Sequence, residues 1–246
     1  QDLRQALAHN EFELYFQPIM DLTNRRLEGA EALLRWRHPQ RGMLSPDVFI
    51  DVAEQSGLIT SIGDWVLLEA CRHAASWHGL RVSVNLSAVQ FHRGNLEESV
   101  ALALDASGLD PALLELELTE SMLLEDSERF LQRLQNLKRL GVQLAIDDFG
   151  TGYSNLAYLQ RFQVDKLKID KSFVTDLSSN EQNLAIVTAI IQMARSLRLQ
   201  TTAEGIETAC VQSVLVELGC KLGQGYLFSR PVPPEDFNGY ARQFRA

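Results

Sequence analysis

The chain alternates between short apolar runs and longer segments in which apolar residues recur every three or four positions. The short runs are typical of buried strands, and the longer periodic segments are typical of helices that bury one face. The predicted strands occupy residues 13–20, 27–36, 81–87, 113–119, 144–146, 164–170, 200–206 and 220–228. The predicted helices occupy residues 1–10, two stretches between 45 and 77, 95–107, 125–140, 181–197, 208–218 and a segment that begins near 234.

This alternation of strands and helices predicts the fold class. Most of the strands are followed by a helix, which favours a mostly parallel sheet, and eight such units in 246 residues favour a closed barrel over an open sheet. Only the six residues 21–26 separate the first two strands, whereas a parallel pair needs a crossover of about a dozen residues or more. We therefore predict an α/β fold, a (β/α)8 TIM-like barrel, whose first strand runs antiparallel to the second. Pro18 suits an edge or a bulge in that strand.

The composition excludes some classes of partner. A net charge of -9 and the scarcity of basic clusters argue against binding to a nucleic-acid polymer. The sequence has no long apolar run and no signal peptide, so we expect no membrane contact by this segment. Three widely spaced cysteines, Cys71, Cys210 and Cys220, exclude the common zinc spacings and suit a reducing compartment. We expect all three to be small packing residues.

The first residue of the chain is Gln1 rather than methionine. We therefore expect residues 1–246 to form one domain of a longer polypeptide, whose other parts could include a sensor or a membrane anchor. The expected location is the cytoplasm, including the cytoplasmic side of a membrane protein.

Two adjacent carboxylates, Asp147 and Asp148, follow the apolar run Leu144–Ile146 and precede a Gly-Thr-Gly turn. Neighbouring side chains of a strand point to opposite faces, so both acids can serve one site only where the strand ends and the backbone turns. Two carboxylates about 4 Å apart repel by roughly 4 kcal/mol at an effective dielectric constant near 20. A site that gathers them therefore usually holds a shared proton or a divalent cation.

Further polar residues lie in or at the ends of the other predicted strands. They are Glu31, Asn85, Glu117, Glu120, Lys168, Asp170, Glu204 and Gln224. In a barrel of parallel strands these ends share one face, where barrel enzymes carry their chemistry. Carboxylates with one asparagine form a hard oxygen site that suits magnesium or manganese, and the five histidines show no metal-binding motif. The pattern predicts hydrolysis of a phosphate diester with two metal ions. In this reaction Lys168 orients the water or neutralises the developing charge on the phosphorane, and Glu204 helps to deprotonate the water.

Several sequence blocks resemble a known family. They are YFQPI before EALLRW at 31–36, SVNLS around Asn85, ELTES at 117–121, DDFGTGYSNL from Asp147, KLKID at 166–170, AEGIE at 203–207 and GQGY at 223–226. Together they closely resemble the EAL-domain cyclic di-GMP phosphodiesterases of bacteria, in order and over nearly the whole chain. The resemblance implies a barrel with one antiparallel strand and hydrolysis of cyclic di-GMP to linear 5'-pGpG. It also implies Mg²⁺ or Mn²⁺ as cofactor, with two ions bound and Ca²⁺ inhibitory.

The resemblance also implies roles for individual residues. The implied metal ligands are Glu31, Asn85, Glu117, Asp147, Asp148 and Glu204. The implied catalytic residues are Glu31, Lys168, Glu204 and Gln224, and the implied substrate contacts are Gln17, Arg35 and Asp170. The forked guanidinium of Arg35 suits a phosphate.

A loop from Phe149 to Asn155 has its own implied role. Glu120 corresponds to the glutamate that steadies this loop, which in the family couples dimerisation to metal binding, and so we expect a homodimer. The common form of the loop ends Ser-Ser-Leu, whereas this chain has Ser154, Asn155 and Leu156. We expect little effect, because asparagine keeps the hydrogen-bonding capacity of serine, and the loop coupling is the function on which this departure bears.

Three functions are compatible with these features. The first is a phosphodiesterase; the second is a receptor that binds cyclic di-GMP without hydrolysing it; the third is a protein scaffold with no nucleotide affinity. Non-hydrolysing relatives usually lack a metal-binding or water-activating residue, and here each of those positions is filled. The sequence therefore favours the enzyme.

Overall fold

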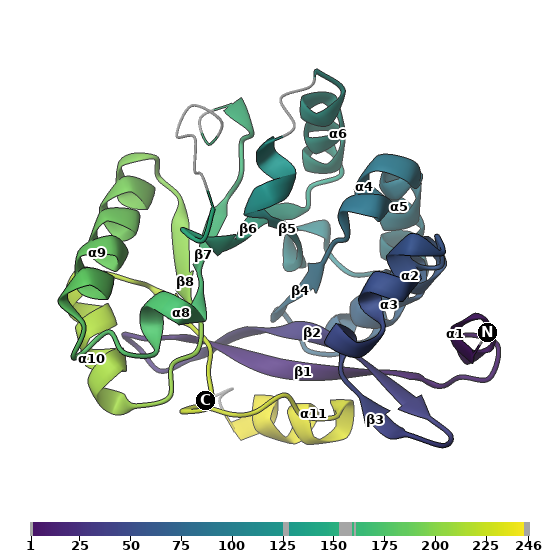
Figure 1. Ribbon diagram of the computed structural model, residues 1–246, viewed down its shortest axis with the longest axis horizontal. Helices are drawn as coiled ribbons and strands as arrows, with labels where there is room; N and C mark the ends of the chain where they lie inside the picture. The colour runs from purple at the N-terminus through teal and green to yellow at the C-terminus, as the bar shows by residue number, and fades with distance from the viewer. Residues whose placement is uncertain (1, 125–127, 153–158, 160, 244–246) are drawn as a thin grey trace.

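The strands curve into a closed barrel with the helices outside it (Figure 1). The structure is a computed structural model that describes residues 2–124, 128–152, 159 and 161–243. The barrel strands are β1 (Phe12–Asp21), β2 (Leu27–His38), β4 (Arg81–Asn85), β5 (Leu114–Thr119), β6 (Gln143–Phe149), β7 (Lys166–Ile169), β8 (Gln200–Ala203) and β9 (Leu222–Gly223). The sheet order is β1-β9-β8-β7-β6-β5-β4-β2-β3, and the pairing of β1 with β2 closes the ring. This confirms the predicted fold class. The short strand β3 (Gly42–Leu44), which was not predicted, extends β2 outside the ring.

The first strand runs against both of its neighbours. Strand β1 pairs antiparallel with β2 along most of its length and with β9 at its end, as the short connection predicts. That connection is a tight turn in which the Asp21 carboxylate accepts the backbone N–H groups of Thr23 and Asn24 at 2.8 and 2.9 Å. The Phe16 amide donates to the carbonyl of Val232, on the side away from β2. Pro18, two residues along, lacks its N–H on that same side and so leaves the β1–β2 ladder intact.

The helices cover the outer face of the barrel. They are α1 (Asp2–Ala6), α2 (Ile50–Gln55), α3 (Ile59–Ala75), α4 (Ala88–Arg93), α5 (Leu96–Ser107), α6 (Glu128–Arg139), α8 (Lys171–Val174), α9 (Glu181–Ser196), α10 (Ala209–Leu218) and α11 (Pro234–Gln243). Short 3₁₀ turns span Pro46–Val48, Pro111–Leu113 and Glu120–Leu124. No helix in the described ranges combines the length and the apolar character that crossing a membrane requires.

Some predicted boundaries were wrong. The predicted strand 220–228 is ordered as β9 over only two residues, because the chain turns away at Gly225, where a Cβ would lie 2.2 Å from the carbonyl oxygen of Ile206. The predicted helix 1–10 ends at Ala6. Helix α4 was missed, although Ser87 and Gln90 form a capping box at its start. Residues 125–127 of the predicted helix 125–140 lie outside the described residues.

An aromatic cluster fixes the outer face of β1. Phe16 meets Trp77 edge-on with ring centroids 4.8 Å apart, and Trp77 lies 4.6 Å from Phe237 of α11. The indole N–H of Trp77 donates to the side chain of Asn238 at 3.0 Å. Since β1 is followed by a turn rather than a helix, α11 supplies the cover that a following helix gives the parallel strands (Figure 1).

The cysteines only partly match their prediction. Cys71 and Cys220 are buried, as expected for packing residues. Cys210 is exposed at the first turn of α10, so the packing prediction was wrong for it. An amphipathic helix buries only one face, and Cys210 lies on the exposed face of α10, whose buried residues are Val211, Gln212 and Leu215.

The close approach of β2 and β4 gives a stability prediction. A Cβ on Gly29 would lie 2.4 Å from the backbone carbonyl oxygen of Arg81, and the backbone there cannot move without disturbing the barrel. We expect Gly29→Ala to lower the free energy of unfolding by about 1–3 kcal/mol, as measured by urea denaturation. The control is Gly239→Ala in α11, where a Cβ meets nothing within 4 Å; it should leave stability unchanged or slightly raised. Equal stability of Gly29→Ala and wild type would contradict the packing described here.

Candidate active site

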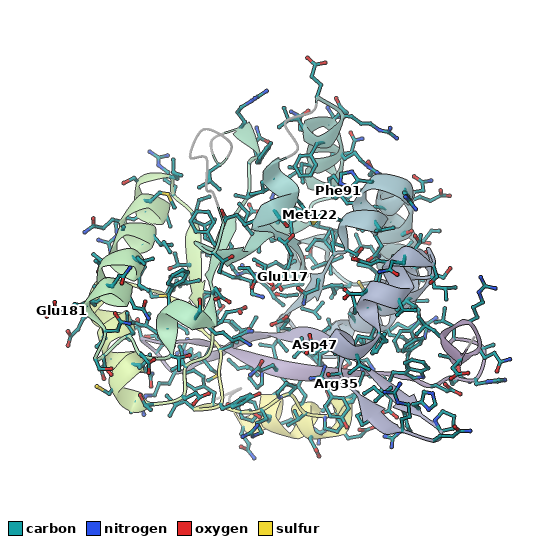
Figure 2. All side chains as sticks on the ribbon, in the orientation of Figure 1. Arg35, Asp47, Phe91, Glu117, Met122 and Glu181 are labelled. Atoms are coloured by element: carbon teal, nitrogen blue, oxygen red, sulfur yellow. The ribbon has the colours of Figure 1, made fainter. Side chains whose placement is uncertain are left out.

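The ammonium of Lys168 lies at the centre of a group of carboxylates. Its side chain is 1% exposed and extends from β7 into the barrel. The Nζ atom lies 2.6 Å from Glu117 Oε2, 2.7 Å from Glu204 Oε1, 3.2 Å from Asp147 Oδ1 and 3.6 Å from Glu31 Oε2. Figure 2 shows Glu117 inside the ring of strands. The four acids come from β2, β5, β6 and the residue after β8, so the barrel brings together positions that are far apart in the sequence.

Two side-chain amides hold Glu31 in place. Its Oε1 accepts a hydrogen bond from Asn85 Nδ2 at 2.7 Å, and its Oε2 accepts one from Gln224 Nε2 at 2.5 Å. Burial works against ionisation of Glu31, but Lys168 and the two amides outweigh it and hold its pKa below the usual value. The structure thus links Asn85 and Gln224 to the Lys168 cluster through Glu31.

Asp147 and Asp148 face the same site because β6 is irregular at this point. The pairing of β6 with β7 shifts register between Ile146 and Phe149, and Asp148 has a left-handed φ of 54°. Oxygen atoms of Asp147, Asp148 and Glu204 all lie within 4.8 Å of one another. The backbone turn that the adjacent acids require is therefore present. Burial, Asp147 and Asp170 together raise the pKa of Asp148.

The four carboxylates around Lys168 exceed what one lysine can neutralise. Burial is the largest influence on Glu204 and raises its pKa to about 8, despite the opposing effect of Lys168. Burial likewise raises the pKa of Glu117 well above its usual value. Among the described residues, the buried Oε1 atom of Glu117 has no hydrogen-bond partner. When these acids are ionised, their negative charge exceeds the positive charge of Lys168, and a divalent cation would compensate the excess.

The donor set fits a hard cation. All six predicted metal ligands lie in this cluster or hydrogen-bond to it: Glu31, Asn85, Glu117, Asp147, Asp148 and Glu204. Carboxylate and amide oxygens are the ligands that Mg²⁺ and Mn²⁺ prefer. The residues present therefore fit a divalent metal.

Glu120 contacts the start of the loop that follows β6. Its Oε2 accepts the backbone N–H of Gly150 at 2.9 Å and that of Gly152 at 3.3 Å. Glu120 therefore contacts the first residues of this loop, and its role in stabilising the whole loop stays a prediction. Residues 153–158, which include Asn155, lie outside the described residues.

Two cavities lie beside the carboxylate cluster. A cavity of about 370 Å³ is lined by Glu31, Glu204 and Gln224 together with Gln17 and Tyr226. Gln17 is the register partner of Glu31 across β1 and β2, and its amide donates to the carbonyl of Ser229 at 3.3 Å.

The second cavity, of about 660 Å³, is lined by Arg35, Asp47 and Asn85 among others, and Leu33 borders both cavities. Figure 2 shows Arg35 and Asp47 near each other beside β2. Arg35 lies over the ring of Tyr15, with its Cζ 5.6 Å from the ring centroid, and its Nη1 donates to the carbonyl of Leu34 at 2.8 Å.

Asp170 has a structural role in the described residues. It caps the N-terminus of α8, where its Oδ1 accepts the backbone N–H of Ser172 at 3.0 Å. It also contributes to the raised pKa of the neighbouring Asp148. Asp170 thus lies beside Asp148, and its role as a substrate contact stays a prediction.

Sequence reasoning missed some residues of this region. Tyr226 is 51% exposed at the edge of the smaller cavity, and the GQGY block contained the signal for it. Thr202 lies on β8 opposite Lys168 in the β7–β8 register. Its hydroxyl is buried and has no hydrogen-bond partner in the part of the chain that the structure describes. Nothing in the sequence marks that threonine, because Thr is common in strands.

The raised pKa of Glu204 gives a prediction for the protein in a chelating buffer. A carboxyl whose pKa is near 8 in the fold and 4.5 otherwise holds its proton more tightly when folded. Stability is therefore lost as the pH rises from about 4.5 through 8. We expect the stability of Glu204→Gln relative to wild type to be about 1–3 kcal/mol greater at pH 9 than at pH 5, measured by thermal unfolding.

The control variant is Glu217→Gln, on an exposed position of α10. Its stability relative to wild type should change little between the two pH values. A Glu204→Gln difference that is the same at pH 5 and pH 9 would show that Glu204 does not hold a proton in the folded state.

Comparisons with known proteins agree with this geometry. The family model described as "EAL domain" matches residues 1–231. The protein named cyclic di-GMP phosphodiesterase NbdA, from Pseudomonas aeruginosa, is 45% identical over the whole of this chain, which spans only 32% of NbdA. The chain therefore covers about a third of that relative's length.

Solved structures are similar over nearly the full length of the chain. The PaMucR phosphodiesterase in complex with c-di-GMP superimposes with a TM-score of 0.92 and 45% identity, covering 96% of this chain and 98% of that one. The FimX EAL domain from Pseudomonas aeruginosa bound to c-di-GMP gives a TM-score of 0.87 and 31% identity, covering 94% of each chain. With the fold, the carboxylate cluster and these matches in agreement, the chain belongs to the EAL domain family.

Proposed function

We propose that this chain hydrolyses one phosphodiester bond of cyclic di-GMP to linear 5'-pGpG with the help of divalent metal ions. The observation that carries the proposal is the convergence of four carboxylates on the Lys168 ammonium, with an acidic charge that exceeds what one lysine can balance. The family membership supports it. So do the name of NbdA and the c-di-GMP bound in the PaMucR complex.

The metal-binding part of the proposal assigns the ligands. Glu31, Asn85, Glu117, Asp147, Asp148 and Glu204 would hold Mg²⁺ or Mn²⁺, and their number suits two ions. A divalent cation supplies charge stabilisation at a phosphate and lowers the pKa of water. Ca²⁺, which prefers longer bonds and more ligands, is the ion expected to inhibit.

The side chains around the metal site have separate roles in the hydrolysis. The ammonium of Lys168 donates hydrogen bonds at the centre of the site, where it can orient the attacking water and stabilise charge that develops on the phosphate. Glu204 borders the smaller cavity and can accept the proton of that water, because a carboxylate beside the attacking water can act as a general base. Gln224 fixes Glu31 and lies 3.4 Å from Glu204 Oε1, so it sets the spacing between them.

The substrate-binding part of the proposal uses the two cavities. A cyclic dinucleotide has two base-bearing halves, and the two cavities meet at Leu33 beside the carboxylates. Gln17 lies in the smaller cavity and Arg35 in the larger. The Arg35 guanidinium suits a phosphate oxygen pair. Asp170, beside Asp148, is the third proposed substrate contact.

The proposal also includes the setting in which the enzyme acts. We propose that two copies form a homodimer and that Glu120 transmits the state of the dimer to the metal ligands, since it binds the loop that follows Asp147 and Asp148. The bacterial second messenger that it would remove is cytoplasmic, so the chain would act in the cytoplasm, as a free protein or as part of a membrane protein.

The test is turnover by the purified chain. With Mg²⁺ or Mn²⁺ the wild type should convert cyclic di-GMP to 5'-pGpG, identified by chromatography, and Ca²⁺ should suppress this. Glu204→Gln should lower kcat by about 10²–10⁴-fold because it removes the proton acceptor, while calorimetry still detects nucleotide binding.

The matched control is again Glu217→Gln, which should keep wild-type turnover. Cyclic di-GMP that is bound but left intact by the wild type would overturn the enzyme and favour a receptor. No nucleotide binding at all would point to a scaffold.

A further inference from the structure

A second buried ion pair lies inside the barrel, below the Lys168 cluster. Lys166 Nζ lies 2.9 Å from Glu115 Oε1 and 2.7 Å from its Oε2. The hydroxyl of Ser83 donates to Glu115 Oε1 at 2.8 Å. The exposed fractions of Lys166, Glu115 and Ser83 are only 3%, 2% and 1%. The pair therefore has no access to solvent.

This pair is unusual for the place it occupies. The interior of a parallel barrel is mostly filled with branched apolar side chains. A buried ion pair carries a desolvation penalty, so replacing it with apolar residues often leaves a protein equally or more stable. Stability alone therefore does not account for Glu115 and Lys166, and a role toward the site above them is the better explanation.

The strand register stacks the two ion pairs directly. Residues two apart in a strand share a face, so Glu115 lies below Glu117 on β5, and Lys166 lies below Lys168 on β7. Ala145 of β6 is the register partner of both Glu117 and Lys166. Lys166 is therefore level with Glu117, yet its ammonium bonds to Glu115. Lys166 therefore pairs with Glu115 and Lys168 with Glu117, although both glutamates lie on the same face of β5.

We propose that Lys166 is a positioning residue: by neutralising Glu115, it keeps the Lys168 ammonium among the carboxylates of the candidate active site. Lys168 is the second lysine whose charge reaches Glu115. A lysine ammonium on its flexible stem can change partner. Without Lys166, the buried Glu115 carboxylate would retain only the Ser83 hydroxyl and would draw Lys168 away from Glu204.

The structural test does not depend on turnover. A crystal structure of Lys166→Gln should show Lys168 Nζ displaced from Glu204, now 2.7 Å away, toward Glu115. The glutamine amide can still donate to Glu115, so this variant changes charge with the least loss of packing. In Glu115→Gln/Lys166→Gln the Lys168 contacts should return, because residue 115 no longer carries a negative charge that attracts Lys168. Lys168 contacts that persist unchanged in Lys166→Gln would overturn the proposal.

The kinetic test rests on the proposed function. Lys166→Met and Lys166→Gln should lower kcat at least about tenfold and change KM for cyclic di-GMP less than about threefold, because binding of the nucleotide does not use Lys166. Glu115→Gln/Lys166→Met should regain kcat to within about threefold of wild type. If the ion pair only stabilised the barrel, the folded single variants would keep wild-type kcat, and that result would overturn the proposal, as would a folded double variant that stays slow.

Two controls keep the outcomes separate. Circular dichroism shows which variants are folded, and Lys166→Gln decides the kinetic test if Lys166→Met is not folded. A wild type that does not hydrolyse cyclic di-GMP would defeat the proposed function alone, since the position of Lys168 in the Lys166→Gln crystal still decides whether Lys166 is a positioning residue.

Discussion

The structure of the site depends on the placement of one buried ammonium among four carboxylates. Lys168 contacts Glu31, Glu117, Asp147 and Glu204 within a water-poor barrel interior, where the attraction to each acid is stronger than in water and so is the repulsion among the acids. One positive charge cannot compensate four negative ones. Burial, with repulsion among the acids, raises the pKa values of Glu117 and Glu204, and divalent cations would favour their ionised forms.

The barrel topology creates this imbalance at a single place. Parallel strands deliver their carboxyl ends to one face, so residues from Glu31 to Gln224 meet there although they are far apart in the sequence. The antiparallel strand β1 brings a further polar residue to this face, since its register places Gln17 opposite Glu31. The irregular end of β6, with Asp148 at a positive φ, lets two adjacent acids face the same site. A regular strand would have pointed one of them away.

Much of this arrangement could be predicted from the sequence because strand ends are easy to locate. The run before Asp147 and the alternation around Glu117 fix both the strands and the face that their polar residues share. One boundary that depends on tertiary packing was missed, because β9 is cut short by the close approach of Gly225 to Ile206. Helix α4 was missed for another reason: it is only 6 residues long, although a capping box marks its start.

The second ion pair was also missed, although both of its charged residues lie in alternating strand segments. The sequence shows that Glu115 and Glu117 share a face, and that Lys166 and Lys168 do, but it does not show which lysine bonds to which glutamate. That depends on the stagger between β5, β6 and β7, which only the register reveals. The same limit applies to Thr202, because the sequence does not show which groups surround its buried hydroxyl.

The most direct test of the central claim is a crystal structure of the protein soaked with Mn²⁺, read by anomalous scattering. The account predicts anomalous peaks bounded by Glu31, Asn85, Glu117, Asp147, Asp148 and Glu204. Manganese found only at surface carboxylates, with this cluster empty and Lys168 still the sole cation among its acids, would contradict it.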